Sequence, residues 1–187
     1  APPPASLGDP AVGSYQQWEH LTQWWLDRMA TSPTPIVEKL TLFWHGHFVS
    51  AKSKVPSMSA LYAQNALYRS HALGDVHALT SAMAVDPAML YYLDNWRNRA
   101  GSPNENFARE LMELFTIGVG NYTEDDVKAS AAAWTGHGLD DTKTAYAFRS
   151  AWHDSGSKTF MGLTRAWDGP EIIDHLLAGA STRTTAA

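Results

Sequence analysis

Cysteine is missing from the 187-residue sequence. Disulfides, Cys-ligated zinc sites and iron–sulfur clusters are therefore excluded, and His, Asp and Glu are left as potential metal ligands. No apolar run approaches the roughly 20 residues that span a bilayer, so we expect no membrane span. The HExxH, GxSxG, P-loop and GxGxxG elements of familiar hydrolase and nucleotide sites are missing too.

Positive charge is sparse as well. The chain has 14 Lys and Arg against 19 Asp and Glu, a net charge of −5, without a dense basic stripe. Nucleic-acid binding depends on neutralising phosphates, so we expect no nucleic-acid partner. A small molecule or a glycan remains as a substrate class, and the sequence indicates no particular protein partner.

The composition that remains is typical of a helical globular protein. A mass of 20.5 kDa with 44% hydrophobic residues suits one compact domain. We predict an all-α fold, a single orthogonally packed domain of about seven or eight helices over residues 14–178. A Pro/Gly/Ala-rich extended arm is predicted for residues 1–13 and a flexible tail for residues 179–187.

The first residues, APPPASLGDP, do not include a starting Met. This indicates either a processed protein or a fragment. A removed export signal would leave such an end, so we expect export to the periplasm or the extracellular space.

Capping residues followed by apolar residues at helical spacing mark the helices. They are predicted to begin at Ser14, Thr34, Ser57, Asp75, Asp86, Ser102 and Thr123, with a last segment over Ile172–Leu177. The helix from Asp86 should reach about Arg99. The helix from Thr34 should bury one face, made of Ile36, Leu40, Phe43, His47 and Phe48. Residues 137–169 are mixed, and the alternation of Tyr146, Phe148 and Trp152 indicates a short hairpin.

Glu110, in the stretch NENFARELMELF, raises the question of function. On a helical wheel it falls inside the apolar stripe, about 40° from Leu114. A buried carboxylate must be paired, hydrogen-bonded, metal-bound or protonated. Asn106 and Glu113 share its flank. Glu105, by contrast, is explained by a capping box with Ser102, and it forms an ion-pair string with Arg109 and Glu113.

Histidine supplies the other candidates. His45 and His47, in FWHGHF, point about 200° apart on a regular helix, so they could share one metal ion only if Gly46 breaks the helix. On an unbroken helix, His47 would face the core and His45 the polar flank. His71 is a further candidate. His153 stands beside Asp154 in a loop-rich region, where functional residues concentrate.

Several of these stretches, in the same order and spacing, resemble the bacterial family called domain of unknown function 1800. They are FWHGHF at 43–48, HALGDVHAL at 71–79, DPAMLYYLDN at 86–95, NENFARELMELFTIGVGNYTEDDV at 104–127, WTGH at 134–137 and HDSGSKTFMG at 153–162. The resemblance covers about residues 34–178. It implies a bacterial source, export and a partial chain, and it carries no catalytic assignment. At WTGH the chain departs from the family pattern, where Trp more often follows the Gly, so His137 receives no special weight.

Two functions from different classes are compatible with these residues. The first is a metal-dependent hydrolase in which a divalent metal activates water. Its catalytic residues would be Glu110, His47 and Asn106, its metal ligands would come from His45, His47 and Glu110, and its binding residues would be His45, His71, Arg109, Glu113, His153 and Asp154. A glycan-directed version using Glu110 and Glu113 ranks lower, because i,i+3 carboxylates flank a sugar poorly. The second is a non-catalytic structural or interaction module in which the same side chains form internal hydrogen bonds and ion pairs, with Glu110 paired to Arg69, Arg97 or a His.

Overall fold

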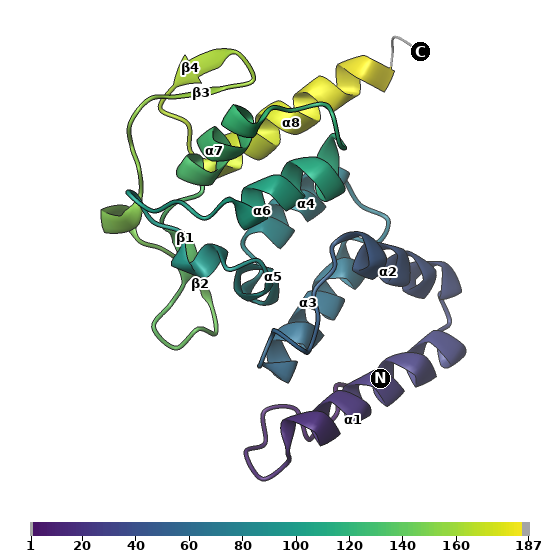
Figure 1. Ribbon diagram of the computed structural model, residues 1–187. Helices are drawn as coiled ribbons and strands as arrows, with labels where there is room; N and C mark the ends of the chain where they lie inside the picture. The colour runs from purple at the N-terminus through teal and green to yellow at the C-terminus, as the bar shows by residue number, and fades with distance from the viewer. Residues whose placement is uncertain (1, 185–187) are drawn as a thin grey trace. The chain divides into compact units, whose positions relative to one another are not determined.

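The computed structural model describes the backbone of residues 2–184 and the side chains of residues 2–178 (Figure 1). These residues form two compact units, divided between Leu79 and Thr80. The structure is mainly helical, as predicted, but it also contains two small two-stranded sheets. No helix in the described part of the chain has the length and apolar character needed to cross a membrane.

Three helices make up most of the first unit: α1 (Ser14–Thr31), α2 (Pro35–His47) and α3 (Met58–Ser70). Their starts follow the predicted signals, since Pro35 stands in the first turn of α2 and the Ser57 hydroxyl accepts a hydrogen bond from the Ala60 amide. Residues 4–12, predicted as an extended arm, form consecutive hydrogen-bonded turns before α1. The Gln17 side chain holds these turns by donating to the carbonyls of Asp9 and Val12.

A buried carboxylate ties the three helices together, and it is Glu38 of α2. Its side chain is only 2% exposed, and its Oε1 lies 2.7 Å from Nε of both Arg28 on α1 and Arg69 on α3. Arg69 Nη2 also donates to Oε2 at 3.0 Å. Each carboxylate oxygen is therefore satisfied by guanidinium donors, the condition under which a charge can be buried.

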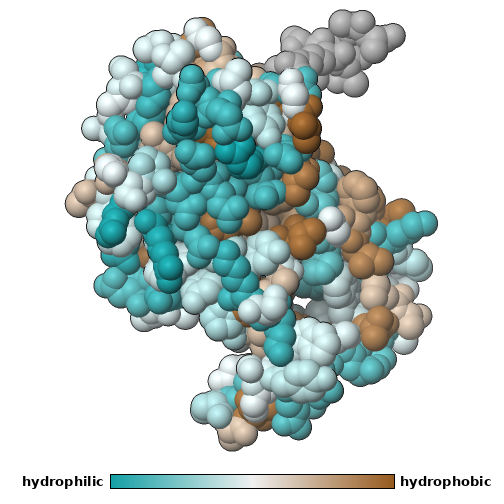
Figure 2. Space-filling model, viewed as in Figure 1, coloured by the Kyte–Doolittle hydropathy of each residue, from teal (hydrophilic) through white to brown (hydrophobic). Residues whose placement is uncertain are grey.

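The orientation of α2 matches the prediction only in part, since Phe48 is buried while Leu40 and His47 are half-buried. Ile36 and Phe43, expected to face the core, are 54% and 57% exposed, whereas Glu38 and Thr41 are buried. Figure 2 shows hydrophobic surface in the area where Figure 1 places α2. The prediction failed for Ile36 and Phe43 because the ion pairs let Glu38, on the polar face of α2, pack inward.

Glu38 should give the protein a stability that falls in acid. Burial alone would raise the pKa of Glu38, but the hydrogen bonds from Arg69 and Arg28 outweigh it, and the pKa is lowered. A carboxylate with a lowered folded pKa stabilises the fold fully above its unfolded pKa, and the contribution is lost as pH falls through the folded value. We expect chemical denaturation at successive pH values from 6 to 3 to give a steeper loss for the wild type than for Glu38→Gln, which does not titrate. Parallel curves would contradict this.

The second unit contains the remaining helices and both sheets. After α4 (Val76–Ala84), which begins in the first unit, come α5 (Pro87–Tyr92), the 3₁₀ helix η1 (Asn95–Arg97), α6 (Glu105–Glu110), the π-helix η2 (Leu111–Thr116), α7 (Glu124–Ala133) and α8 (Gly169–Thr184). One hairpin pairs β1 (His137–Leu139) with β2 (Tyr146–Phe148), and another pairs β3 (Lys158–Phe160) with β4 (Leu163–Arg165). A hairpin within 137–169 is thus confirmed, and a second one accompanies it.

Local signals in this unit were confirmed at some helix ends and overridden at others. The Thr123 capping box with Asp126 is present. The expected box between Ser102 and Glu105 is wrong, since Asn104 caps α6 and Ser102 forms a bridge with Arg99 instead. The helix from Asp86 ends at Tyr92, because Asp94 adopts a left-handed conformation with φ of 59°.

The last helix among the described residues is α8. Its apolar face, Ile172, Ile173 and Leu176, is buried as the spacing predicted. The backbone remains helical to Thr184, within the segment predicted as a flexible tail. Residues 185–187 of that predicted tail lie outside the described residues.

Candidate functional site

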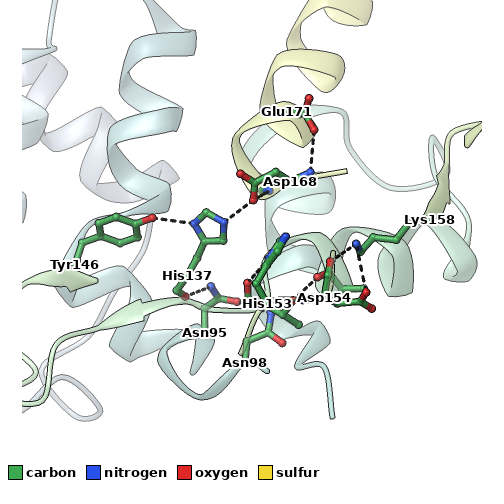
Figure 3. A network of polar contacts seen from close by, with 12 residues as sticks. Asn95, Asn98, His137, Tyr146, His153, Asp154, Lys158, Asp168 and Glu171 are labelled. Carbon is green, nitrogen blue, oxygen red and sulfur yellow. Dashed lines mark hydrogen bonds and ion pairs between the residues drawn. The ribbon is translucent and has the colours of Figure 1, made fainter. Parts of the chain in front are cut away.

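Two histidines and an aspartate meet in the second unit, on three different segments (Figure 3). His137 opens β1, His153 follows the short 3₁₀ helix η3 (Ser150–Trp152), and Asp168 directly precedes α8. One ligand atom from each lies within 4.8 Å of the others, the only such grouping of three metal-binding side chains among the residues that the structure describes. We call these three residues the triad.

His137 is the buried member, with a side chain 4% exposed. Its Nε2 lies 2.8 Å from Asp168 Oδ1, and its Nδ1 lies 3.0 Å from the Tyr146 hydroxyl. A carboxylate only accepts hydrogen bonds, so Nε2 donates to Asp168 and Nδ1 accepts from Tyr146. Both ring nitrogens of His137 are therefore engaged.

His153 is held differently. Its Nδ1 lies 2.8 Å from the Thr135 carbonyl oxygen. A carbonyl oxygen can only accept, so Nδ1 carries the proton and Nε2 has a free lone pair when the ring is neutral. A hydrogen bond of this kind on the other nitrogen is how metal-binding histidines are usually oriented.

Buried amides fix the backbone around the triad. Asn95 Nδ2 donates to the His137 carbonyl at 2.8 Å (Figure 3). Asn98 Nδ2 donates to the Ala131 carbonyl at 2.8 Å. The Gly136 amide donates to the Asn98 carbonyl at 3.0 Å. These contacts hold the turn between α7 and β1 against η1, and so they set the position of His137.

Asp168 is fixed by the start of α8. Its Oδ1 accepts from the Gly169 amide at 2.8 Å, and its own amide donates to Glu171 Oε2 at 2.9 Å. Burial acts to raise the pKa of Asp168, but the hydrogen bonds from His137 and from the Gly169 amide lower it overall. For His137, burial lowers the pKa more than Asp168 raises it. A neutral imidazole beside an ionised carboxylate is the protonation state that ligates metals.

The donor set of the triad, two imidazoles and one carboxylate, is that of many catalytic metal sites. Three protein ligands leave coordination positions free for water or substrate. A divalent zinc or iron ion is compatible with this set, whereas calcium and magnesium prefer oxygen ligands.

Of the site residues predicted from sequence, three lie in the first unit. His45 packs edge-on against Trp25, with 5.1 Å between ring centroids. His47 contacts the rings of Phe43 and Phe48. His71 caps the end of α3, with Nδ1 3.1 Å from the Leu67 carbonyl oxygen.

The others lie in the second unit. Glu110 is half-buried, and burial, followed by the charge of Glu113, raises its pKa. Arg109 pairs with Glu124 at 2.7 Å and with Glu105 at 3.3 Å. Glu113 accepts from the Tyr122 hydroxyl at 2.6 Å, and Asn106 Nδ2 donates to the Leu93 carbonyl at 3.3 Å. The predicted metal ligands His45, His47 and Glu110 do not form a three-ligand group in the described part of the chain.

The structure does bring His153 and Asp154 to the triad region. Asp154 itself supports the loop, since its amide donates to Thr135 Oγ1 at 2.8 Å and its Oδ1 accepts from the Gly156 amide at 2.8 Å. Lys158 Nζ donates to the carbonyl oxygens of Asp154 and Gly156 (Figure 3).

Sequence reasoning missed His137 and Asp168. They lie 16 residues before and 15 residues after His153, a separation that no short motif covers. One signal was available in the sequence. Both residues lie next to a Gly and close to a Trp, in WTGH and in WDG, at the two ends of the loop-rich segment.

Comparison with known proteins gives a family and no function. No curated protein and no solved structure matches the chain. One family model, described as "Protein of unknown function (DUF1800)", matches residues 9–186, nearly the whole chain. The family resemblance of the motifs is thereby confirmed, and the chain belongs to the DUF1800 family.

Proposed function

We propose that the chain binds one divalent transition-metal ion through His137, His153 and Asp168 and that this site serves metal-dependent hydrolysis. The observation that carries the proposal is the clustering of three ligand atoms within 4.8 Å. The Thr135 carbonyl adds to it, because it holds the neutral His153 ring in the tautomer whose Nε2 carries no proton. The natural ligand atoms are Nε2 of each histidine and a carboxylate oxygen of Asp168.

Ligation would require His137 to move its proton from Nε2 to Nδ1. Tyr146 accommodates either tautomer, because its hydroxyl can donate to Nδ1 or accept from it. A divalent ion held there would supply a bound water of lowered pKa, the usual nucleophile of metal-dependent hydrolysis. The contribution of the chain is to fix its three ligands through Tyr146, Thr135 and the start of α8.

Metal affinity tests this proposal directly. We expect the metal-stripped protein to take up zinc with near 1:1 stoichiometry in calorimetry, and elemental analysis of untagged protein to find a transition metal. His153→Ala should weaken zinc binding by about 100-fold or more, since it removes one of three ligands. His20→Ala, at an exposed histidine of α1, is the matched control and should leave binding unchanged. Wild-type protein that takes up no metal after reloading would overturn the proposal.

A second candidate function, a non-catalytic module, is favoured by the saturation of His137. Both of its ring nitrogens already have protein partners, so the residue can serve as a tie between β1, β2 and α8. Asp168→Asn separates the two functions because its amide oxygen can still accept from His137 while its charge is lost. If these side chains form only a structural tie, neither the wild type nor Asp168→Asn should take up zinc. If they form a metal site, the wild type should take up zinc and Asp168→Asn should lose most of that uptake.

A further inference from the structure

The first unit contains a cavity that neither the triad nor the ion pairs of Glu38 explain. Its volume is about 340 Å³, and it lies between α1, α2, α3 and the loop at residues 50–52. That volume is within the range of small-molecule sites, roughly 300–1,000 Å³. The cavity is lined wholly by residues of the first unit.

Two tryptophans of α1 give the cavity flat apolar walls. Trp18 and Trp25 line it, together with Leu21 and Leu61. The Trp25 ring packs edge-on against His45, with 5.1 Å between the ring centroids. Flat indole surfaces beside polar groups suit a ligand whose body is a ring with both apolar and polar faces.

Two polar side chains of the lining, Asn65 and His45, have nitrogen atoms without a protein hydrogen-bond partner among the described residues. Asn65 is 7% exposed, and its Oδ1 accepts from Arg69 Nη2 at 2.7 Å. This bond fixes the amide so that Nδ2 is left as a donor with no protein acceptor among the described residues. His45 likewise makes ring contacts, with Trp25 and Tyr68, but neither of its ring nitrogens has a hydrogen-bond partner in the described part of the chain.

His45 adds hydrogen-bonding capacity without charge. Burial lowers the pKa of His45, which favours the neutral ring at neutral pH. A neutral imidazole has one donor and one acceptor, as sugar hydroxyls do. Asn65 and His45 can therefore form hydrogen bonds with the hydroxyl groups of a ligand, which a purely apolar ligand surface does not offer.

One cation and no carboxylate line the cavity. Lys52 is half-buried, with Nζ 4.9 Å from the ring centroid of Tyr15 and 5.6 Å from that of Trp18. No acidic side chain pairs with Lys52 within the described residues. The contacts with the two rings hold the ammonium at the cavity wall, where it favours an anionic ligand.

We propose that this cavity binds a sugar acid of monosaccharide size, a hexuronate. The sugar ring would lie against the tryptophan wall, its carboxylate would meet Lys52, and its hydroxyls would meet Asn65 Nδ2 and the ring nitrogens of His45. This inference is independent of the metal site, because no residue is shared.

Titration with three probes tests the ligand class. We expect D-glucuronate to bind in calorimetry or in an NMR titration at least tenfold more tightly than D-glucose, which has no carboxylate, and than benzoate, which has no hydroxyls. No saturable binding of glucuronate at about 10 mM would overturn the proposal. Benzoate binding more tightly than glucuronate would also overturn it, in favour of an aromatic carboxylate.

Two variants locate the binding. Lys52→Met keeps the aliphatic stem and removes the charge, and it should weaken glucuronate at least tenfold. His45→Phe keeps a ring against Trp25 and removes the nitrogens, with a similar expected loss. Lys39→Met, at an exposed lysine of α2, is the control and should bind as the wild type does. Unchanged affinity in Lys52→Met would contradict the assignment, and His153→Ala should leave glucuronate binding intact.

Discussion

Glu38→Ala is expected to lower the free energy of unfolding by about 3–5 kcal/mol, because it leaves two guanidinium groups facing a vacated buried site. Arg28 and Arg69 both place Nε 2.7 Å from Glu38 Oε1, and Arg69 is itself largely buried. Removing the carboxylate leaves these charges without their compensating partner. Since the three side chains come from α1, α2 and α3, the loss affects the packing of the whole first unit.

Chemical denaturation followed by circular dichroism measures this effect. Glu19→Ala is the matched control, since it makes the same change of charge at an exposed position of α1 and should shift stability by no more than about 0.5 kcal/mol. Arg69→Ala should be costly for the reciprocal reason, as it strips Oε2 of its donor. Equal stability of Glu38→Ala and Glu19→Ala would show that the buried ion pairs contribute nothing.

Glu38 also explains why the buried face predicted for α2 was wrong in part. The apolar stripe of Ile36, Leu40 and Phe43 has helical spacing, and an amphipathic reading places it inward. The partners that allow Glu38 to be buried lie on α1 and α3, 10 residues before it and 31 after it. Periodicity within one helix contains no information on such partners. The residue at which this helix begins could therefore be predicted, but the face that it buries could be predicted only in part.

The unusual geometry around Glu110 has a different origin. The wheel argument assumed a regular helix through Leu114, yet residues 111–116 form a π-helix in which the Ile117 amide bonds to the Met112 carbonyl. The wider turn rotates later residues away from the expected stripe, and Leu114 is 57% exposed. Glu110 is half-buried, and burial and the charge of Glu113 raise its pKa, so its environment was predicted in part, while the exposure of Leu114 was not.

The candidate metal site could be predicted even less. His153 was identified because a histidine beside an aspartate stood in a loop-rich segment. His137 and Asp168 reach it only through the turn after α7, the β1–β2 hairpin and the start of α8. Asn95 and Tyr146, 42 and 9 residues from His137 in sequence, hold His137, and Thr135, 18 residues from His153, holds His153. No short motif encodes contacts at these separations.

Gly136→Ala is a substitution that should damage this arrangement strongly. Gly136 has φ of +80°, a conformation that costs a non-glycine residue roughly 1–2 kcal/mol. An added Cβ would also lie 2.7 Å from the Arg149 carbonyl oxygen and 3.1 Å from His153 Cβ. Overpacking of this kind costs typically 1–3 kcal/mol, so the total expected loss of stability is about 3 kcal/mol.

Gly101→Ala separates the two causes. Gly101 has nearly the same φ, +82°, but an added Cβ there has nothing within 4 Å. It should therefore show the cost of the left-handed backbone alone, about 1 kcal/mol. The excess loss in Gly136→Ala, about 2 kcal/mol, measures the clash with residues 149 and 153.

Because that clash pushes His153 away from β1, zinc affinity should fall about tenfold or more in Gly136→Ala and stay unchanged in Gly101→Ala. Equal destabilisation with equal zinc binding in the two variants would mean that the turn after α7 does not hold the two histidines together.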